Sequence, residues 1–168
     1  MDSWQLDTPS GPPLLGDVLP LDRSLSIFSS LTRSVESIQT RLNDAGVNTT
    51  VLAPGNEAIS RLPRKPWEDP EDGEGGDKGD KGKYSGMGGE DRAGRNLRRF
   101  VEMHCVGVSP WEKGVKVRTV GGGEVWWDED AEGRKIYPDG IKVKRVQGEV
   151  ENGALWVLEG VVNYAEKE

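Results

Sequence analysis

The stretch TTVLAPGNEAISRL, residues 49–62, decides how the first half of the fold is organised. Residues 49–53 begin with two threonines and continue with apolar side chains, which is typical of a β-strand, and the breaker Pro54 ends that strand. Asn56 is predicted to be the N-cap of a helix over 56–62, because its short polar side chain can accept hydrogen bonds from the first turn. The stretch therefore predicts a strand, a tight corner and a short helix.

Helical and strand-type periodicities divide the rest of the chain. Apolar residues recur at steps of three and four over 22–46, which predicts one amphipathic helix or two placed end to end, and again over 92–104. Short segments of β-type composition follow, separated by glycine-rich or Asp/Asn-containing turns: 115–120, 124–128, 134–137, 141–150 and 154–162. Helices followed by a meander of strands favour an α+β domain over an alternating α/β domain.

Composition and charge exclude several classes of protein. The chain has 168 residues, of which 34% are hydrophobic and 30% charged, enough for one domain with a real core but short for two. The net charge of −7 argues against nucleic acid and anionic membranes as partners, because no stripe of Lys and Arg is present to neutralise phosphates. Cys105 is the only cysteine, so an intrachain disulfide and a cysteine-based zinc site are excluded, and no metal or cofactor is expected.

Shifts in composition mark the expected domain boundaries. Residues 1–17 are expected to form an extended, proline-containing lead-in, residues 18–163 a single domain, and residues 164–168 a tail. Residues 64–91 are acidic, glycine-rich and poor in aliphatic side chains, which predicts a flexible loop; a single calcium-binding glycine-aspartate repeat is the alternative. The sequence lacks a run of about 20 apolar residues and a signal-peptide start, so the chain as given is expected to be soluble, with removal of an upstream leader left open.

Residues suited to catalysis are scarce in this sequence. His104 is the only histidine, and it lies on the apolar face of the helix predicted over 92–104, which favours a structural role over that of a general base. The common hydrolase, metalloprotease and nucleotide-binding motifs are missing, and the paired carboxylates cluster in turns. The sequence therefore predicts a protein that is not an enzyme, with a hydrolase acting through Asp and Glu as the remaining catalytic alternative.

Tryptophan is the one unusual feature of the composition, with six tryptophans against two phenylalanines. Trp126 and Trp127 are adjacent in a predicted strand, so their side chains point to opposite faces and one at most enters a one-sided core. The other is either covered by the loop or the lead-in, or exposed to stack on a sugar or on an apolar patch of a partner. Trp67 and Trp111 each follow a proline closely and are interpreted as loop anchors.

Asn48 begins the triplet Asn-Thr-Thr, which is an acceptor sequence for N-glycosylation. Such triplets also arise by chance, so the motif alone is weak evidence for the secretory pathway. Asn48 is the candidate glycan site of this chain.

Three motifs in the same order resemble those of fasciclin domains. TTVLAPGNEAISRL resembles the first fasciclin signature, NLRRFVEMHCVGVSP the helix that ends in a Tyr-His pair, and IKVKRVQGEVENGALWVLEGVVN the closing segment. The agreement extends from about residue 18 to residue 163, and LPRKPWEDPED with the acidic loop resembles the single-domain fasciclin proteins of fungi. The positions that carry the first signature are Thr50, Val51, Ala53, Pro54 and Asn56.

The resemblance implies a fold and a function. It implies a wedge of N-terminal helices beside a mostly antiparallel strand sandwich, and a monomeric, non-catalytic module for adhesion or scaffolding. It also implies a secreted, cell-surface or vacuolar glycoprotein that contacts a protein, cell-wall or membrane-surface partner. A carbohydrate- or lipid-binding domain that uses exposed tryptophans is the alternative.

Two departures from the family pattern affect the expected contacts. Met103-His104 stands where the family has Tyr-His, so a contact that needs the tyrosine hydroxyl is in doubt, while His104 is given a structural place beside the first signature. Trp156 stands where a histidine is common and is expected to pack in the core, with ligand stacking as the alternative. The residues expected to contribute to interaction are Met103, His104, Trp111, Trp126 and Trp127.

Overall fold

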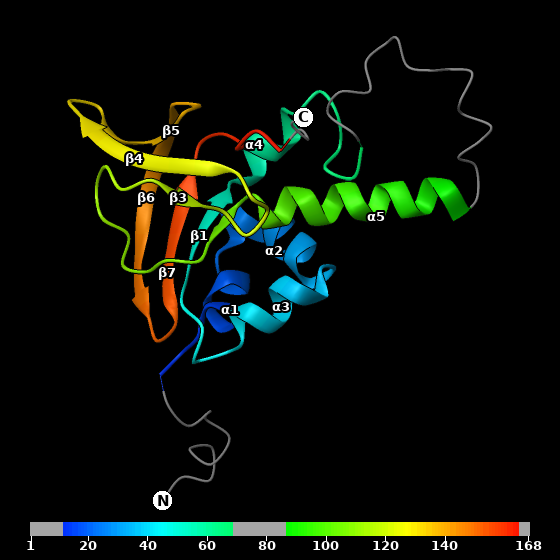
Figure 1. The fold of residues 1–168 in the computed structure, drawn as a ribbon, viewed down its shortest axis with the longest axis horizontal. Coiled ribbons are helices and arrows are strands. Elements are labelled where there is room, and N and C mark those ends of the chain that lie inside the picture. The colour runs from blue at the N-terminus through cyan, green and yellow to red at the C-terminus, as the bar shows by residue number, and fades with distance from the viewer. Residues whose placement is uncertain (1–11, 69–86, 165–168) are drawn as a thin grey trace, which may run out of the picture.

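The computed structural model describes residues 12–68 and 87–164. The helices in these ranges are α1 (Leu15–Val18), α2 (Ser26–Arg33), α3 (Glu36–Leu42), α4 (Asn56–Ser60) and α5 (Met87–Glu102), with two 3₁₀ turns, η2 (Leu19–Leu21) and η3 (Arg23–Leu25). The strands are β1 (Thr49–Pro54), β2 (Cys105–Val106), β3 (Val117–Arg118), β4 (Glu124–Asp130), β5 (Gly133–Tyr137), β6 (Ile141–Val150) and β7 (Gly153–Leu158). Helices pack beside a mixed sheet (Figure 1), which confirms the α+β prediction.

The predicted strand and short helix of residues 49–62 are present as β1 and α4, but the N-cap prediction for Asn56 was wrong. Gly55 occupies the N-cap position of α4. The Asn56 side chain instead reaches the start of α2, where its Oδ1 accepts from the Ile27 N–H at 2.9 Å and its Nδ2 donates to the Arg23 carbonyl at 3.0 Å. It thereby satisfies an N–H group that the first turn of α2 leaves without an intrahelical partner.

The sheet has the strand order β2-β1-β7-β6-β5-β4-β3, in which β1 and β7 pair in parallel and all other neighbours are antiparallel. The sheet folds back on itself, because Trp127 of β4 lies edge-on to Trp156 of β7 at 5.4 Å although two strands separate them in the order. A β-bridge between Val106 and Thr119 also joins the two ends of the sheet. This arrangement is the sandwich that the family resemblance implied.

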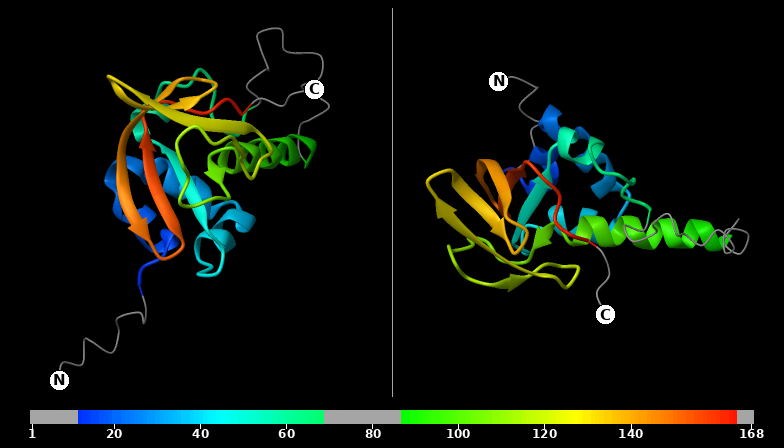
Figure 2. Two further views of the ribbon diagram at one scale, coloured as in Figure 1. Left: turned by 60° about the vertical axis from the view of Figure 1, so that its left-hand side comes forward. Right: turned by 90° about the horizontal axis from the view of Figure 1, so that it is seen from above.

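The helices gather on one side of β1, the strands β3 to β5 lie on the other, and α5 runs out from the body (Figure 2). Both β1 and β7 are buried at every residue because they are covered from both sides. The largest fully buried side chains include Phe28, Phe100, Ile38, Leu52, Leu155 and His104.

The turn between β6 and β7 anchors the first helix. Gly153 has a φ of +152°, and a Cβ atom there would lie 1.8 Å from the Thr49 carbonyl oxygen, so only glycine fits beside β1. Asn152 is fully buried, and its Oδ1 accepts from the Leu15 N–H at 2.9 Å while its Nδ2 donates to the Leu42 carbonyl at 3.0 Å. The lead-in expected over 1–17 therefore reaches too far, because Leu15 belongs to α1 and is buried in the core.

Two further boundaries differ from the expectation. The helix α5 begins at Met87, inside the loop expected over 64–91. The sequence did not indicate this start because the glycines near it have a low helix propensity. Tyr164, placed in the expected tail, is buried with its ring at right angles to Phe100 at a centroid distance of 4.8 Å. The calcium alternative falls on glycine-aspartate residues within 69–86, which lie outside the described residues.

Candidate functional site

His104 is sealed in the core, as the sequence analysis predicted. Its ring packs against Phe28 and Phe100 at centroid distances of 5.7 and 4.7 Å. The Val162 N–H donates to Nε2 at 2.9 Å, so Nδ1 carries the ring proton and donates to the Phe100 carbonyl at 2.7 Å. Burial lowers the pKa of His104 to about 4, so the ring is neutral at physiological pH and exchanges no proton with a substrate at the surface.

The other groups that could take part in catalysis are either buried, as Cys105 is, or paired at the surface, as Asp130 and Glu132 are. Burial raises the pKa of the Cys105 thiol to about 12, so this group stays protonated and unreactive. Asp130 and Glu132 lie at the exposed β4–β5 turn and pair with Lys135 at 3.2 and 3.0 Å. Within residues 12–68 and 87–164, no group of three or more His, Cys, Asp or Glu side chains is placed to hold a metal ion.

Met103 lies beneath the glycine loop that connects β3 to β4. Its Sδ accepts from the Thr119 hydroxyl at 3.4 Å, and a Cβ atom at Gly123 would lie 2.4 Å from the methionine methyl group. The position at which the family has a tyrosine is therefore filled by a buried thioether that this loop encloses. Met103 and His104 belong to the core of this chain, and the structure does not place them on a contact surface.

Three tryptophans join the two layers of the sheet. Trp111 stacks on Trp156 at 5.4 Å, and the Trp127 indole N–H donates to the Trp111 carbonyl at 3.0 Å. The Arg134 guanidinium lies 4.2 Å from the ring centroid of Trp127. Trp156 is buried, as expected, and Trp111 and Trp127 are buried with it, because the folded sheet brings β4 against β7. These rings pack the interior and are not placed for contact with a partner.

Trp126 points to the opposite face from Trp127, as the strand alternation predicted, and it is half-buried. Tyr137 of β5 stacks on its ring at 6.0 Å with an interplanar angle of 19°, and the Lys116 ammonium lies 4.7 Å from the ring centroid. These two contacts cover part of the indole, and Trp126 also lines a cavity of about 570 Å³ together with Lys116. Trp126 is therefore less open to a sugar or a partner than a fully exposed tryptophan.

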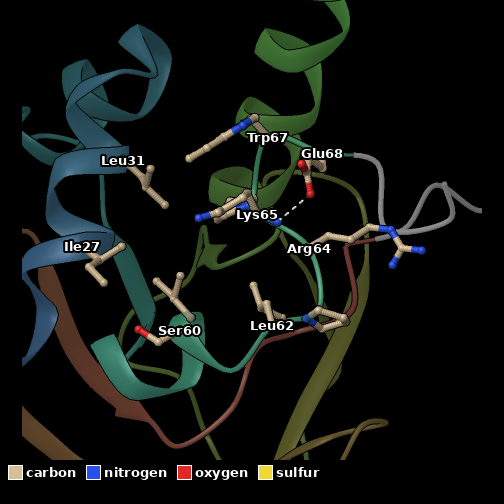
Figure 3. A pocket seen from close by; sticks show the side chains of 11 residues that line it. Ile27, Leu31, Ser60, Leu62, Arg64, Lys65, Trp67 and Glu68 are labelled. Carbon is tan, nitrogen blue, oxygen red and sulfur yellow. Dashed lines mark hydrogen bonds between the residues drawn. The ribbon is translucent and has the colours of Figure 1, made fainter. Parts of the chain in front are cut away.

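Among the tryptophans that the structure describes, Trp67 is the exposed one, and the sequence analysis treated it only as a loop anchor. It is 43% exposed and forms one wall of a groove of about 510 Å³ between α2, α4 and residues 62–68. Figure 3 shows Trp67 and Lys65 projecting across this groove toward Ile27 and Leu31 of α2, whereas Arg64 points away. The sequence indicated only that Trp67, which follows Pro66, lies in a loop, and it did not indicate this groove.

Hydrogen bonds to the main chain of residues 65–68 hold the turn that carries Trp67 in place. The Lys65 N–H donates to the Glu68 carboxylate at 3.0 Å, and the Glu68 N–H donates to the Lys65 carbonyl at 2.9 Å, which closes the turn. The Asn96 side chain of α5 donates to the Trp67 carbonyl at 3.2 Å. The Lys65 ammonium lies 5.9 Å from the Trp67 ring centroid. The turn is therefore fixed at some distance from α2, which keeps the groove open.

Asn48 lies on the surface immediately before β1. Its side chain is exposed and donates to the Ser109 carbonyl at 3.2 Å, and the sequon hydroxyl of Thr50 is buried and donates to the Val108 carbonyl at 2.6 Å. A glycan on Asn48 would point into solvent. Glycosylation at Asn48 stays a prediction.

Comparisons with known proteins bear on this fold. No protein-family model matches the sequence. The chain is 48% identical over 152 residues to a FAS1 domain-containing protein of Aspergillus fumigatus, 48% over 151 residues to one of Neurospora crassa and 46% over 151 residues to one of Emericella nidulans, covering 90, 89 and 90% of this chain. The chain is therefore similar to fasciclin (FAS1) domain-containing proteins of fungi. These relatives support the expected fungal origin.

A solved structure shows the same fold. The FAS1 domain pair from the insect cell adhesion molecule fasciclin I matches with a TM-score of 0.59 over 89% of this chain and 50% of that chain, at 14% identity. The FAS1 family is associated with adhesion, and its domains are generally non-enzymatic protein-interaction modules of typically extracellular or cell-surface proteins. This chain spans 62 to 65% of the length of the three fungal relatives. In the described part of the chain, every helix is too short or too polar to cross a membrane.

Proposed function

We propose that this FAS1-like domain is a non-catalytic adhesion or scaffolding module of the fungal secretory or vacuolar system, monomeric on its own and glycosylated at Asn48. Its role is to hold a protein or cell-wall partner. The observation that carries the proposal is the contrast between its sealed reactive groups and its open groove: His104 and Cys105 are buried, while Trp67 stands exposed on a fixed turn. A rigid exposed aromatic beside an apolar groove is the type of surface on which binding hot spots form.

Expression in a fungal host tests the compartment. We expect a glycosidase to increase the gel mobility of the wild-type domain, and we expect Asn48→Gln to abolish that shift. Asn43→Gln is the matched control, since Asn43 is exposed nearby but is not in an acceptor triplet. A cytosolic domain with no mobility shift would contradict the secretory part of the proposal.

Capture from cell-wall and vacuolar fractions tests the interaction. We expect the wild-type domain to retain a defined set of proteins or wall polymers that Trp67→Ala retains poorly. Leu21→Ala is the matched control, because Leu21 is 77% exposed and does not line the groove. Wild-type domain that retains nothing beyond the empty resin would overturn the proposal.

Binding of a carbohydrate or lipid is the second candidate function, and the exposure of Trp67 is the observation that favours it. Trp127 is buried and the ring of Trp126 is contacted by Tyr137 and Lys116, so we assign the proposed ligand contact to Trp67 and not to the predicted Trp126–Trp127 pair. A glycan or lipid that stacks on Trp67 should shift the tryptophan emission of the wild type and leave that of Trp67→Phe unchanged. Emission that stays constant across a panel of wall glycans and lipids would remove this candidate.

A further inference from the structure

The groove beside Trp67 has a mainly apolar lining, with the Lys65 ammonium directed across it and the Glu68 carboxylate at its turn, where that carboxylate accepts from the Lys65 N–H. Ile27 and Leu31 form the wall on α2, and Leu62 lines the end of the groove next to α4. The Lys65 ammonium reaches over the Trp67 ring, at 5.9 Å from its centroid, and among the described residues it forms no ion pair. The chemistry of the groove is therefore that of an apolar slot with a cation at its edge.

This chemistry selects among the classes of partner. An oligosaccharide needs several hydrogen-bonding side chains around its hydroxyl groups, and the walls of this groove are mainly aliphatic and aromatic. Recognition of an anionic membrane surface needs a cluster of several Lys and Arg side chains, whereas Lys65 is the cation directed across this groove. A peptide segment with an aliphatic or aromatic side chain next to a carboxylate satisfies both the slot and the cation.

The groove is also prepared for such a segment before binding. The turn that carries Trp67 is closed by the two hydrogen bonds between Lys65 and Glu68, and Asn96 of α5 fixes the main chain of Trp67. A main chain that is already fixed loses little conformational entropy on binding, so mainly the side-chain torsions of Trp67 remain to be ordered.

We propose that the groove between Trp67 and α2 binds a short acidic segment of a partner protein, which inserts an apolar side chain against Trp67 and pairs a neighbouring carboxylate with Lys65. This inference rests on the proposed role of the domain as an interaction module, and it names the part of the partner that the module recognises. Anionic lipid is the competing ligand that the experiment distinguishes.

Fluorescence anisotropy with labelled synthetic peptides tests the proposal. The probe alternates Glu with Leu and Phe, and the two comparison peptides replace Glu with Lys, or Leu and Phe with Ser. We expect only the Glu-Leu-Phe probe to bind, with an affinity that falls about tenfold or more in Trp67→Ala and in Lys65→Glu. Lys116→Glu is the matched control, because Lys116 also lies over a tryptophan but on another face of the domain, and its affinity should stay within about twofold of the wild type.

Several outcomes would overturn the proposal. If the lysine peptide bound as tightly as the glutamate peptide, Lys65 would not pair with a carboxylate of the partner. If Trp67→Ala bound the probe with unchanged affinity, the groove would not be the binding site. No peptide binding together with binding to phosphatidylserine vesicles, but not to phosphatidylcholine vesicles, would assign the groove to lipid. If wild type and Trp67→Ala captured partners from wall or vacuolar fractions equally well, the domain would still be an interaction module. Its contact surface would then lie outside the groove.

Discussion

Protonation of the buried histidine is expected to destabilise the domain as the pH falls from about 6.5 toward 4. The folded state holds His104 neutral, since Nε2 accepts from the Val162 N–H and burial lowers the pKa to about 4 from the ordinary 6.5. The unfolded chain takes up a proton at the ordinary pKa, so in this range it binds more protons than the folded chain. The free energy of unfolding therefore decreases as the pH is lowered.

The size of this effect follows from the difference in pKa. A difference of about 2.5 pKa units corresponds to about 3 kcal/mol when the full range is crossed, and to about 2 kcal/mol between about pH 7.5 and pH 5. His104 is the only histidine in the chain, so no other histidine contributes to the slope in this window. Carboxylates add their own dependence mainly below about pH 5, because their ordinary pKa values lie near 4.

Urea denaturation followed by tryptophan fluorescence measures this dependence. The variant His104→Gln keeps an amide donor and acceptor but cannot titrate, so we expect a lower stability than the wild type and a nearly flat profile between about pH 7.5 and pH 5. Should this variant fail to fold, the ring C–H resonances of the wild type report the same quantity directly. Parallel pH profiles for the two proteins, or a His104 midpoint near 6.5, would refute the reasoning.

Substitutions at three positions test the architecture by their effect on the urea midpoint. Asn56→Ala removes the hydrogen bonds that join α4 to the start of α2 and should cost about 1 to 3 kcal/mol, whereas Asn56→Asp keeps the acceptor for Ile27 and should cost less. Gly153→Ala should cost more than about 3 kcal/mol or prevent folding, because the new methyl group would meet the Thr49 carbonyl; a loss below about 1 kcal/mol would contradict this. Gly94→Ala should raise stability by about 0.5 to 1 kcal/mol, because the site lies in α5 with open space around it, and a lower midpoint would count against this description.

The features that could be predicted from the sequence are those governed by local rules. The strand and helix of residues 49–62 follow from composition and from a proline, and the opposite orientations of Trp126 and Trp127 follow from the alternation of a strand. The role of Asn56 could not be predicted, because its partner Ile27 lies 29 residues away. The local sequence does not show that the side chain contacts the start of α2 and leaves the N-cap position of α4 to Gly55. The burial of Trp127 depends on the folding of the sheet, which no local pattern records.

The candidate site was missed for a related reason. Exposure of Trp67 depends on three contacts: the Lys65–Glu68 turn, the hydrogen bond from Asn96, and the position of α2 on the far side of the groove. Residues 64–68 belong to a segment whose charge, glycine and proline content predicted a flexible loop, and such a composition is shared by ordered turns and mobile chains. The family resemblance did not help here, because it pointed to the Met103-His104 pair, which is buried.

The tryptophans of this domain divide between stability and recognition. Trp111, Trp127 and Trp156 contact one another across the folded sheet, so removing any of them leaves a cavity in the core and should lower stability and binding together. Trp67 is held through its main chain, and its exposed ring contributes less to the core. A substitution at Trp67 should therefore reduce binding while leaving the urea midpoint close to that of the wild type, and this separation of the two effects is what an interaction module with a preformed contact surface requires.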